Sequence, residues 1–268
     1  MKKNTIAILV ATYNWPEALK KSLESILGQT VLPDEIIIAD DGSDKNTEAV
    51  INDIKEKTSI PVTHLWQEDN GFRKTLILNK AVAHIKSDYI IQIDGDIVLD
   101  PHFIEDHTEL MERGYYVCGS RVKLTEQSTL RVLQEGNFRI STKDMKMSFM
   151  LNTLRVGWLR KLMAERYGRK LDHLRGCNMA FWKSDFIAVN GYNEDLLQWG
   201  HEDGELILRM HNYGVKKKFL KFGGIAYHLW HKEASRANEQ RHFEEIKNVT
   251  ENKTIRCENG IDKYLKNK

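Results

Sequence analysis

The sequence predicts an α/β protein: a Rossmann-like, mostly parallel sheet flanked by helices, with a helical insertion. In the first hundred residues short apolar runs alternate with helical patterns, which is the order of βαβ units. Each run is continuously apolar, as in parallel strands that are covered on both faces. From residue 124 to 174 the alternation stops and the pattern becomes helical and basic.

Apolar periodicity predicts the elements in order. The expected strands are Ile6–Thr12, 36–39, 62–66, 89–93 and 178–182, with one or two more within 215–227. Helices are expected around 19–27, 49–54, 76–85 and 202–213, and in the charged tail from 236. We therefore divide one continuous domain into a Rossmann-like half (1–123), a helical basic insertion (124–175), a second half (176–235) and a C-terminal helical tail (236–268).

Composition narrows the class of protein. A length of 268 residues fits one large domain, and 40 Lys and Arg against 38 Asp and Glu give no global attraction to nucleic acid. The longest early apolar run, 6–11, is too short for a membrane-spanning helix or a signal peptide. Three cysteines without a CxxC pair suit a reducing compartment. We therefore expect a soluble, cytoplasmic protein.

Polar residues follow the predicted strands at the edge where open α/β sheets bind ligands. Thr12 and Asn14 follow the first strand, and Asp40 and Asp41 follow the second. An aspartate there can accept a hydrogen bond from a base or a ribose hydroxyl, or it can belong to the turn before the next helix. Because neither GxGxxG nor GxxxxGK[ST] occurs, a dehydrogenase and a P-loop ATPase are disfavoured.

A second pair of acids ends the strand at 89–93. Asp94 and Asp96 are separated by one glycine, and carboxylates of this kind suit Mg²⁺ or Mn²⁺. A surface turn is the alternative interpretation, since Asp and Gly are turn residues. His228 and His231 follow a later apolar strand, where an imidazole can join the same metal as Asp96.

The most unusual stretch is Trp-Gly-His-Glu-Asp-Gly-Glu at 199–205. The indole of Trp199 offers a flat apolar face of the kind on which sugars stack. Glu202 and Asp203 begin a predicted helix, whose dipole favours negative charge, and a carboxylate held there can act as a general base. Capping of the helix explains the two acids but not the Trp-Gly pair before them.

Seven motifs in register resemble glycosyltransferase family 2, and more closely its bacterial members whose C-terminal half is shared with β1,4-galactosyltransferases, polypeptide GalNAc-transferases and chondroitin-polymerase-type enzymes. The motifs run in order from residue 6 to about 243, with the helical insertion outside them: ATYNWPEALKKSLESIL, ADDGSD, QEDNGFRKTLILNKAV, DYIIQIDGDI, GCNMAFWKSDF, NGYNEDLLQWGHEDGEL and YHLWHKEASRANE. The resemblance implies a GT-A fold, a nucleotide-diphosphate sugar donor that is most often a UDP-sugar, one Mn²⁺ or Mg²⁺ ion, and an inverting single displacement. The 1–123 half would bind the nucleotide sugar, and the 176–235 half would hold the acceptor and the catalytic residues.

The resemblance also implies roles for single residues around the donor. Asp96 would bind the metal directly, and His231 matches the family's late metal histidine better than His228 does. The residues that would border the nucleotide are Thr12, Asn14, Asp41 as acceptor for the uracil, Arg73 near the base or diphosphate, and Asp94 at the ribose or metal.

Further roles implied by the resemblance concern the acceptor and the chemistry. Trp199 would line the acceptor pocket, Glu202 would contact the donor sugar, and Asp203 would be the general base. Gly204 stands where galactosyltransferases have a third acid that touches the acceptor, so their acceptor preference does not carry over.

The expected function is therefore an inverting hexosyltransferase that moves a sugar from a UDP-sugar to a hydroxyl of a glycan or lipid-linked glycan. Assembly of capsule, O-antigen and exopolysaccharide all fit, and the donor sugar, acceptor and linkage stay open. One alternative is a catalytically silent protein that binds nucleotide sugars or carbohydrate. The other is a metal-dependent phosphohydrolase built on the aspartate pairs.

The insertion allows two interpretations. Between 139 and 175, ten Lys and Arg against three acids leave a local charge of +7, interleaved with Met, Leu and Trp. One interpretation is a helical subdomain with an apolar face on the sheet and a basic face in water. The other is a surface that docks on anionic lipid, with the protein peripheral on the inner face of the cell membrane.

Overall fold

The computed structural model describes residues 4–135, 140–170, 176–196, 200, 202–232 and 239–265. Its centre is a seven-stranded sheet with the order β3-β2-β1-β4-β8-β6-β9. Strands β1 to β4 run parallel, β6 pairs parallel with β9, and β8 runs antiparallel to β4 and β6, so the sheet is mostly parallel, as predicted. The bounds are β1 Ile6–Thr12, β2 Glu35–Asp40, β3 Val62–Trp66, β4 Tyr89–Asp94, β6 Tyr115–Gly119, β8 Met179–Trp182 and β9 Lys216–Leu220.

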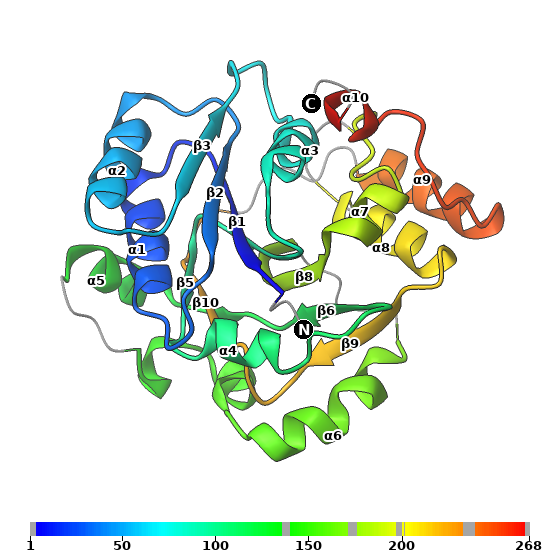
Figure 1. Cartoon of the computed structure of the whole chain (residues 1–268). Coiled ribbons are helices and arrows are strands. Elements are labelled where there is room, and N and C mark those ends of the chain that lie inside the picture. The colour runs from blue at the N-terminus through cyan, green and yellow to red at the C-terminus, as the bar shows by residue number, and fades with distance from the viewer. Residues whose placement is uncertain are drawn as a thin grey trace.

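Helices cover both faces of this sheet (Figure 1). Because successive side chains of a strand point to opposite faces, Ile8 of β1 joins α1 and α2 in one apolar cluster, and Leu9 joins α3 and α8 in the other. The core therefore lies on both sides of the sheet. The helices are α1 Pro16–Leu27, α2 Lys45–Glu56, α3 Lys74–His84, α4 Phe103–Thr108, α7 Lys183–Ala188 and α8 Glu202–Asn212, and a 3₁₀ turn, η3, spans Gly176–Asn178.

The predicted strands and helices of the first half are confirmed to within a few residues, but one expectation about burial is wrong. The side chains of β3 are partly or fully exposed, because β3 lies at the end of the sheet and pairs only with β2. The structure also adds a small sheet that the sequence did not predict, with the order β5-β10-β7. Its strands are β5 Ile97–Leu99, β7 Val122–Lys123 and β10 Ala226–His228.

The insertion contains α5 (Glu126–Gln134), two 3₁₀ segments, η1 (Thr142–Asp144) and η2 (Met147–Thr153), and α6 (Gly157–Gly168). The expectation of one apolar and one basic face is wrong for α6. Its buried residues are Arg160, Ala164 and Gly168, while Trp158 and Leu162 are 72% and 68% exposed. The guanidinium of Arg160 can lie inside because carboxylates meet it there.

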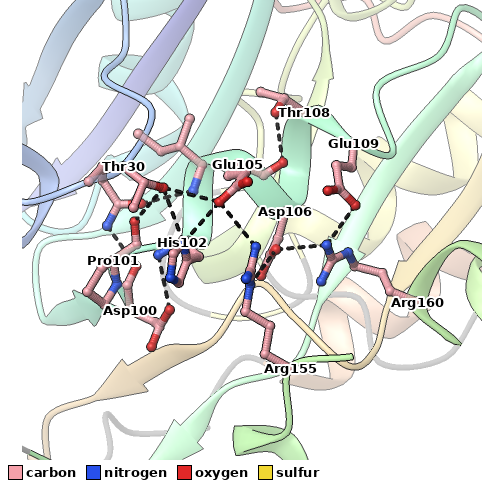
Figure 2. A network of polar contacts seen from close by, with 12 residues as sticks. Thr30, Asp100, Pro101, His102, Glu105, Asp106, Thr108, Glu109, Arg155 and Arg160 are labelled. Carbon is pink, nitrogen blue, oxygen red and sulfur yellow. Dashed lines mark hydrogen bonds and ion pairs between the residues drawn. The ribbon is translucent and has the colours of Figure 1, made fainter. Parts of the chain in front are cut away.

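A buried ion pair joins α6 to α4 (Figure 2). Arg160, 1% exposed, lies 2.9 Å from Oδ1 of Asp106 and donates to the carbonyl of Phe222 at 3.0 Å. Nε of Arg155 donates to the same Asp106 oxygen at 2.9 Å, and the second oxygen accepts from the Gly224 N–H at 2.8 Å. One carboxylate therefore holds together α4, the insertion and the turn that leads into β10.

The tail is helical in two pieces, α9 (Glu239–Glu251) and α10 (Asp262–Leu265), with non-helical chain between them. The three cysteines are buried, and none of them forms a disulfide with another described residue. Among the described residues, no helix combines the length and the apolar character that crossing a bilayer requires.

Candidate functional site

One carboxylate and two imidazoles converge at the turn after β4. Asp96 lies between β4 and β5, and β5 pairs antiparallel with β10 so that His228 is opposite Ile97. Nε2 of His228 lies 3.4 Å from Oδ2 of Asp96, and Nε2 of His231 lies 3.2 Å from it. One ligand atom from each of the three residues lies within 4.8 Å of the others. The register of the small sheet thus brings together the residues predicted to bind a metal, and it includes both histidines.

The charge states favoured at Asp96 and His228 suit a bound cation. Burial raises the pKa of Asp96, but its hydrogen bond with His231 and the charges of His228 and Lys74 outweigh burial and lower the pKa overall. Burial lowers the pKa of His228, which favours the neutral imidazole that a metal needs. The hydrogen bond to Asp96 raises the pKa of His231.

The donor set itself also fits a divalent ion. Oδ1 of Asp96 is buried and has no hydrogen-bond partner among the described residues, although buried carboxylate oxygens are usually paired. A carboxylate with two imidazoles suits a divalent transition metal better than Mg²⁺, which prefers oxygen ligands.

Asp203 is held in place by a backbone N–H and a buried tyrosine. Its Oδ2 accepts from the Gly176 N–H at 2.7 Å, and its Oδ1 accepts from the Tyr192 hydroxyl at 2.9 Å. Gln92, fully buried in β4, donates to the Tyr192 oxygen at 2.8 Å. A Cβ on Gly176 would lie 2.6 Å from Cγ of Asp203, so a larger residue would displace the carboxylate. A carboxylate has about four lone-pair positions, so Asp203 can still accept from a further hydroxyl.

Lys74, at the start of α3, is a cation among these acids. Its Nζ lies 2.7 Å from Oδ1 of Asp94, and its side chain is 16% exposed. Burial alone lowers the pKa of Lys74, but Asp94, Asp203 and Glu202 outweigh burial and raise it well above its usual value. Glu202, which is buried, accepts from the Gly200 N–H at 3.0 Å, and burial together with the charge of Asp203 raises the pKa of Glu202. Lys74 therefore offsets part of the negative charge that gathers here.

Asp41 directly follows β2 and contacts the loop before α3. Its Oδ1 accepts from Nε2 of Gln67 at 2.6 Å, and its Oδ2 accepts from the Arg73 N–H at 2.7 Å. Burial is the main cause that raises the pKa of Asp41. The guanidinium of Arg73 donates to the carbonyl of Glu68 in the same loop. Asp41 and Arg73 are thus neighbours, as their predicted roles at one nucleotide require.

The loops after β1, β2 and β4 are adjacent. Asn14 has a φ of 44°, a left-handed conformation in which Asn is enriched. Its N–H donates to Oγ of Ser43 at 2.9 Å, and its Oδ1 accepts from the Asp44 N–H at 2.9 Å. A Cβ on Gly95 would lie 3.0 Å from Oγ1 of Thr12. Thr12 and Asn14 therefore join the two aspartate loops at one edge of the sheet.

The acids after β4 and the acid of α8 surround one region. The pKa of the Cys177 thiol is raised to about 12. Burial is the largest cause, the charge of Asp94 is the next, and the charges of Asp96 and Asp203 have smaller effects. Cys177 belongs to η3, which packs on β4 and whose Gly176 N–H binds Asp203. Trp199, predicted to line the acceptor pocket, lies outside the described residues.

Sequence reasoning missed several residues of this site. Lys74 follows Arg73 in the motif QEDNGFRKTLILNKAV, so the sequence already shows a cation beside the predicted site. Gln92 stands within a continuous apolar strand, and a polar residue at such a position is itself a signal. Tyr192 and Gly176 carry no comparable local signal, because their contacts with Asp203 arise only from the fold.

Two family models match parts of the chain that contain residues of this site. The family model described as glycosyl transferase family 2 matches residues 7–185. The model described as the N-terminal domain of galactosyltransferase matches residues 160–232. The first match includes the aspartate loops after β2 and β4, and the second includes Asp203 and both histidines.

Relatives of known activity are longer than this chain. It is 24% identical to chondroitin synthase of Escherichia coli over 83% of this chain and 34% of the relative. It is 25% identical to hyaluronan synthase of Pasteurella multocida over 83% of this chain and 24% of the relative. It is 35% identical to poly-beta-1,6-N-acetyl-D-glucosamine synthase of Staphylococcus aureus over 80% of this chain and 47% of the relative. The chain thus spans a quarter to a half of the length of these relatives.

Solved structures share the fold. TarS of S. aureus in complex with UDP-GlcNAc matches with a TM-score of 0.65 at 13% identity, over 97% of this chain and 70% of that one. A mannosyltransferase from Pyrobaculum calidifontis in complex with GDP-Man and Mn²⁺ matches with a TM-score of 0.62 at 16% identity, over 88% and 60%. The fold is GT-A. Since the first family model covers residues 7–185 of the 268, the chain belongs to glycosyl transferase family 2.

Proposed function

We propose that this chain catalyses the transfer of a sugar from a UDP-sugar to a hydroxyl of a glycan acceptor, with inversion at the anomeric carbon. The single observation that carries the proposal is the placement of Asp203, which accepts hydrogen bonds from Tyr192 and from Gly176 of η3, the 3₁₀ turn that packs on β4. The names of the relatives, which are synthases of chondroitin, hyaluronan and poly-N-acetylglucosamine, support assembly of a bacterial surface polysaccharide.

Asp96, His228 and His231 would hold the divalent ion. The resemblance favours His231 over His228, whereas their similar distances from Asp96 allow both to ligate. When bound, such an ion neutralises the negative charge that builds on the departing diphosphate. Arg121 lies close enough to lower the pKa of both imidazoles, and its positive charge can also attract the diphosphate.

Asp203 takes the proton from the acceptor hydroxyl as that oxygen attacks the anomeric carbon from the face opposite UDP. Gly176 and Tyr192 fix the orientation of the carboxylate, which matters because a shift of about 1 Å can cost about a hundredfold in rate. The raised pKa of Glu202 favours a protonated carboxyl, which can donate a hydrogen bond to a hydroxyl of the donor sugar.

The test is UDP release, measured with a panel of UDP-sugars and glycan acceptors in Mn²⁺. We expect release that depends on the acceptor and on the metal, and a loss of about 10²- to 10⁴-fold in turnover for Asp203→Asn. Asp53→Asn is the matched control, because its carboxylate is 43% exposed and pairs with Lys57 on α2. Circular dichroism and urea unfolding establish that both variants fold.

Three outcomes would contradict the proposal. Near-normal turnover of folded Asp203→Asn would remove the assigned base. Cleavage of the donor to UMP and sugar 1-phosphate without any acceptor would indicate a phosphohydrolase instead. Binding of UDP-sugars with no release under any condition would indicate a nucleotide-sugar-binding protein without catalysis.

A further inference from the structure

Large apolar side chains are exposed together on the insertion. In the described part of the chain fifteen such side chains are exposed, and seven of them lie between 147 and 167. Isolated exposed apolar residues are ordinary, but a group of them marks an interaction surface. We name these seven residues the insertion surface: Met147, Met150, Leu151, Leu154, Trp158, Leu162 and Tyr167.

The packing of α6 leaves these side chains facing outward. Figure 1 shows α6 along the rim of the molecule beside β9. The helix approaches that strand closely through Ala164 and Gly168, and a Cβ on Gly168 would overlap the backbone of Lys217. Trp158 and Leu162 are four residues apart and therefore share another face. The side of α6 that meets the sheet is already filled, so the exposed residues do not complete the core.

The charges around the insertion surface have mostly one sign. The exposed acid among residues 140–170 is Glu165. Arg155 is partly neutralised by Glu105 and Asp106, and Nζ of Lys161 lies 3.7 Å from Glu109. The exposed cations of the same range are Lys143, Lys146, Arg155, Lys161, Arg166, Arg169 and Lys170.

We propose that the insertion surface docks on a membrane that contains anionic lipid. Exposed Leu, Met and Trp side chains among lysines and arginines match an interfacial site, where apolar groups enter the lipid boundary and cations contact the headgroups. A second copy of the chain is disfavoured as the occupant, because two such surfaces would bring cation against cation. The proposal goes beyond sugar transfer and does not depend on it.

The docked surface lies next to the candidate site. Segment η2 packs on β7, and β7 pairs with β10, with Lys123 opposite His228. Nζ of Lys221, just after β9, donates to Oδ1 of Asn152 in η2 at 2.8 Å. Docking therefore brings Asp96, His228 and His231 close to the lipid, where a lipid-linked acceptor would lie.

Co-sedimentation of the whole chain with lipid vesicles tests the proposal, with no sugar donor present. We expect binding to phosphatidylcholine vesicles that contain about one third phosphatidylglycerol, little binding to phosphatidylcholine alone, and release by salt. Trp158→Glu combined with Leu162→Glu should reduce binding at least about tenfold, and Lys146→Glu combined with Arg166→Glu should do the same, since each interfacial cation contributes about fivefold.

Two double variants serve as matched controls and should bind as the unmodified protein does. Leu32→Glu with Ile255→Glu makes the same apolar-to-acid change at sites that are 52% and 40% exposed. Lys55→Glu with Lys86→Glu makes the same charge reversal at exposed lysines outside the insertion.

The proposal is overturned if binding is the same with and without anionic lipid, or if no binding occurs. It is also overturned if the control variants lose as much vesicle binding as the insertion variants. Sedimentation velocity gives the remaining outcome: a dimer that Trp158→Glu with Leu162→Glu converts to monomers, without lipid binding, would assign the surface to a second copy. UDP release measured in solution should be equal for all these variants. A failure here thus leaves sugar transfer standing, and a failure of sugar transfer leaves the lipid result standing.

Discussion

Replacing Arg160 by Met should destabilise the folded state strongly. The guanidinium is 1% exposed and contacts Asp106 at 2.9 Å, Glu109 at 2.7 Å and the carbonyl of Phe222 at 3.0 Å. Removing one partner of a buried ion pair costs about 3–5 kcal/mol, because the other charge stays in the interior without compensation. Asp106 keeps its bonds to Arg155 and to one backbone N–H, so we expect a loss near about 3 kcal/mol, the lower end of that range.

Urea unfolding followed by tryptophan fluorescence measures this loss. Lys161→Met is the matched control, since Lys161 is the next residue, its side chain is 61% exposed, and its Nζ lies 3.7 Å from Glu109. An exposed pair of this kind contributes at most about 1 kcal/mol. Asp106→Asn combined with Arg160→Met should cost less than the sum of the single variants, because no charge is then left alone.

Two results would refute this reasoning. The first is a loss below about 1 kcal/mol for Arg160→Met, which would mean that the ion pair hardly stabilises the contact between α4 and α6. The second is strict additivity in the double variant, which would mean that the two side chains do not interact.

Two further predictions concern the site and the core. Gly176→Ala should lower turnover about a hundredfold with little change in UDP affinity, because its Cβ would displace the Asp203 carboxylate. Gly204→Ala is the control, and its UDP release should stay near normal. Its new Cβ would lie 3.8 Å from Ile246, and among the described residues it would meet nothing else within 4 Å apart from the backbone of its own helix. Equal losses in both variants would contradict the assigned position of Asp203. Acid should destabilise the protein through His107, which is fully buried and whose pKa burial lowers from 6.5 to about 4. As pH falls below 6.5 the unfolded chain binds this proton first, so stability falls by about 3 kcal/mol on reaching pH 4. His107→Gln, which keeps a donor for Asn178, should show a flatter fall in urea unfolding between pH 7 and pH 4, and an unchanged slope would contradict the assignment.

The central strands could be predicted because burial on both faces leaves a continuous apolar run. The prediction of Ile6–Thr12 coincides with β1, and β4 extends only one residue beyond the predicted 89–93. β5 and β7 have three and two residues, which is too short to show any period. These strands exist because β10 pairs with both of them, and that pairing joins distant parts of the chain.

The candidate site also has parts that could be predicted from local motifs and parts that depend on the fold. Asp96 and a late histidine were assigned together from their motifs, and the structure places Asp96 3.2 Å from His231, while the metal itself remains a prediction. The bonds from Tyr192 and Gly176 to Asp203 could not be predicted, because they depend on how α8 lies against β4 and η3. The exposure of Trp158 could not be predicted either. The sequence does not show that Arg160, two residues later, is a buried residue of α6.

The turn from Phe222 to Gly224 has a mechanical consequence. Phe222 and Gly224 both have left-handed backbone, with φ of 61° and 54°, and the carboxylate of Asp106 and the guanidinium of Arg160 hold this shape. β10 begins two residues later and ends at His228. Only three residues separate the clamped turn from His228, and β10 is paired with β5 and β7 on both sides, so the turn and the two neighbouring strands together set the position of His228. A displacement of α6 should therefore also shift His228, so the insertion and the candidate metal-binding residues Asp96, His228 and His231 should move together.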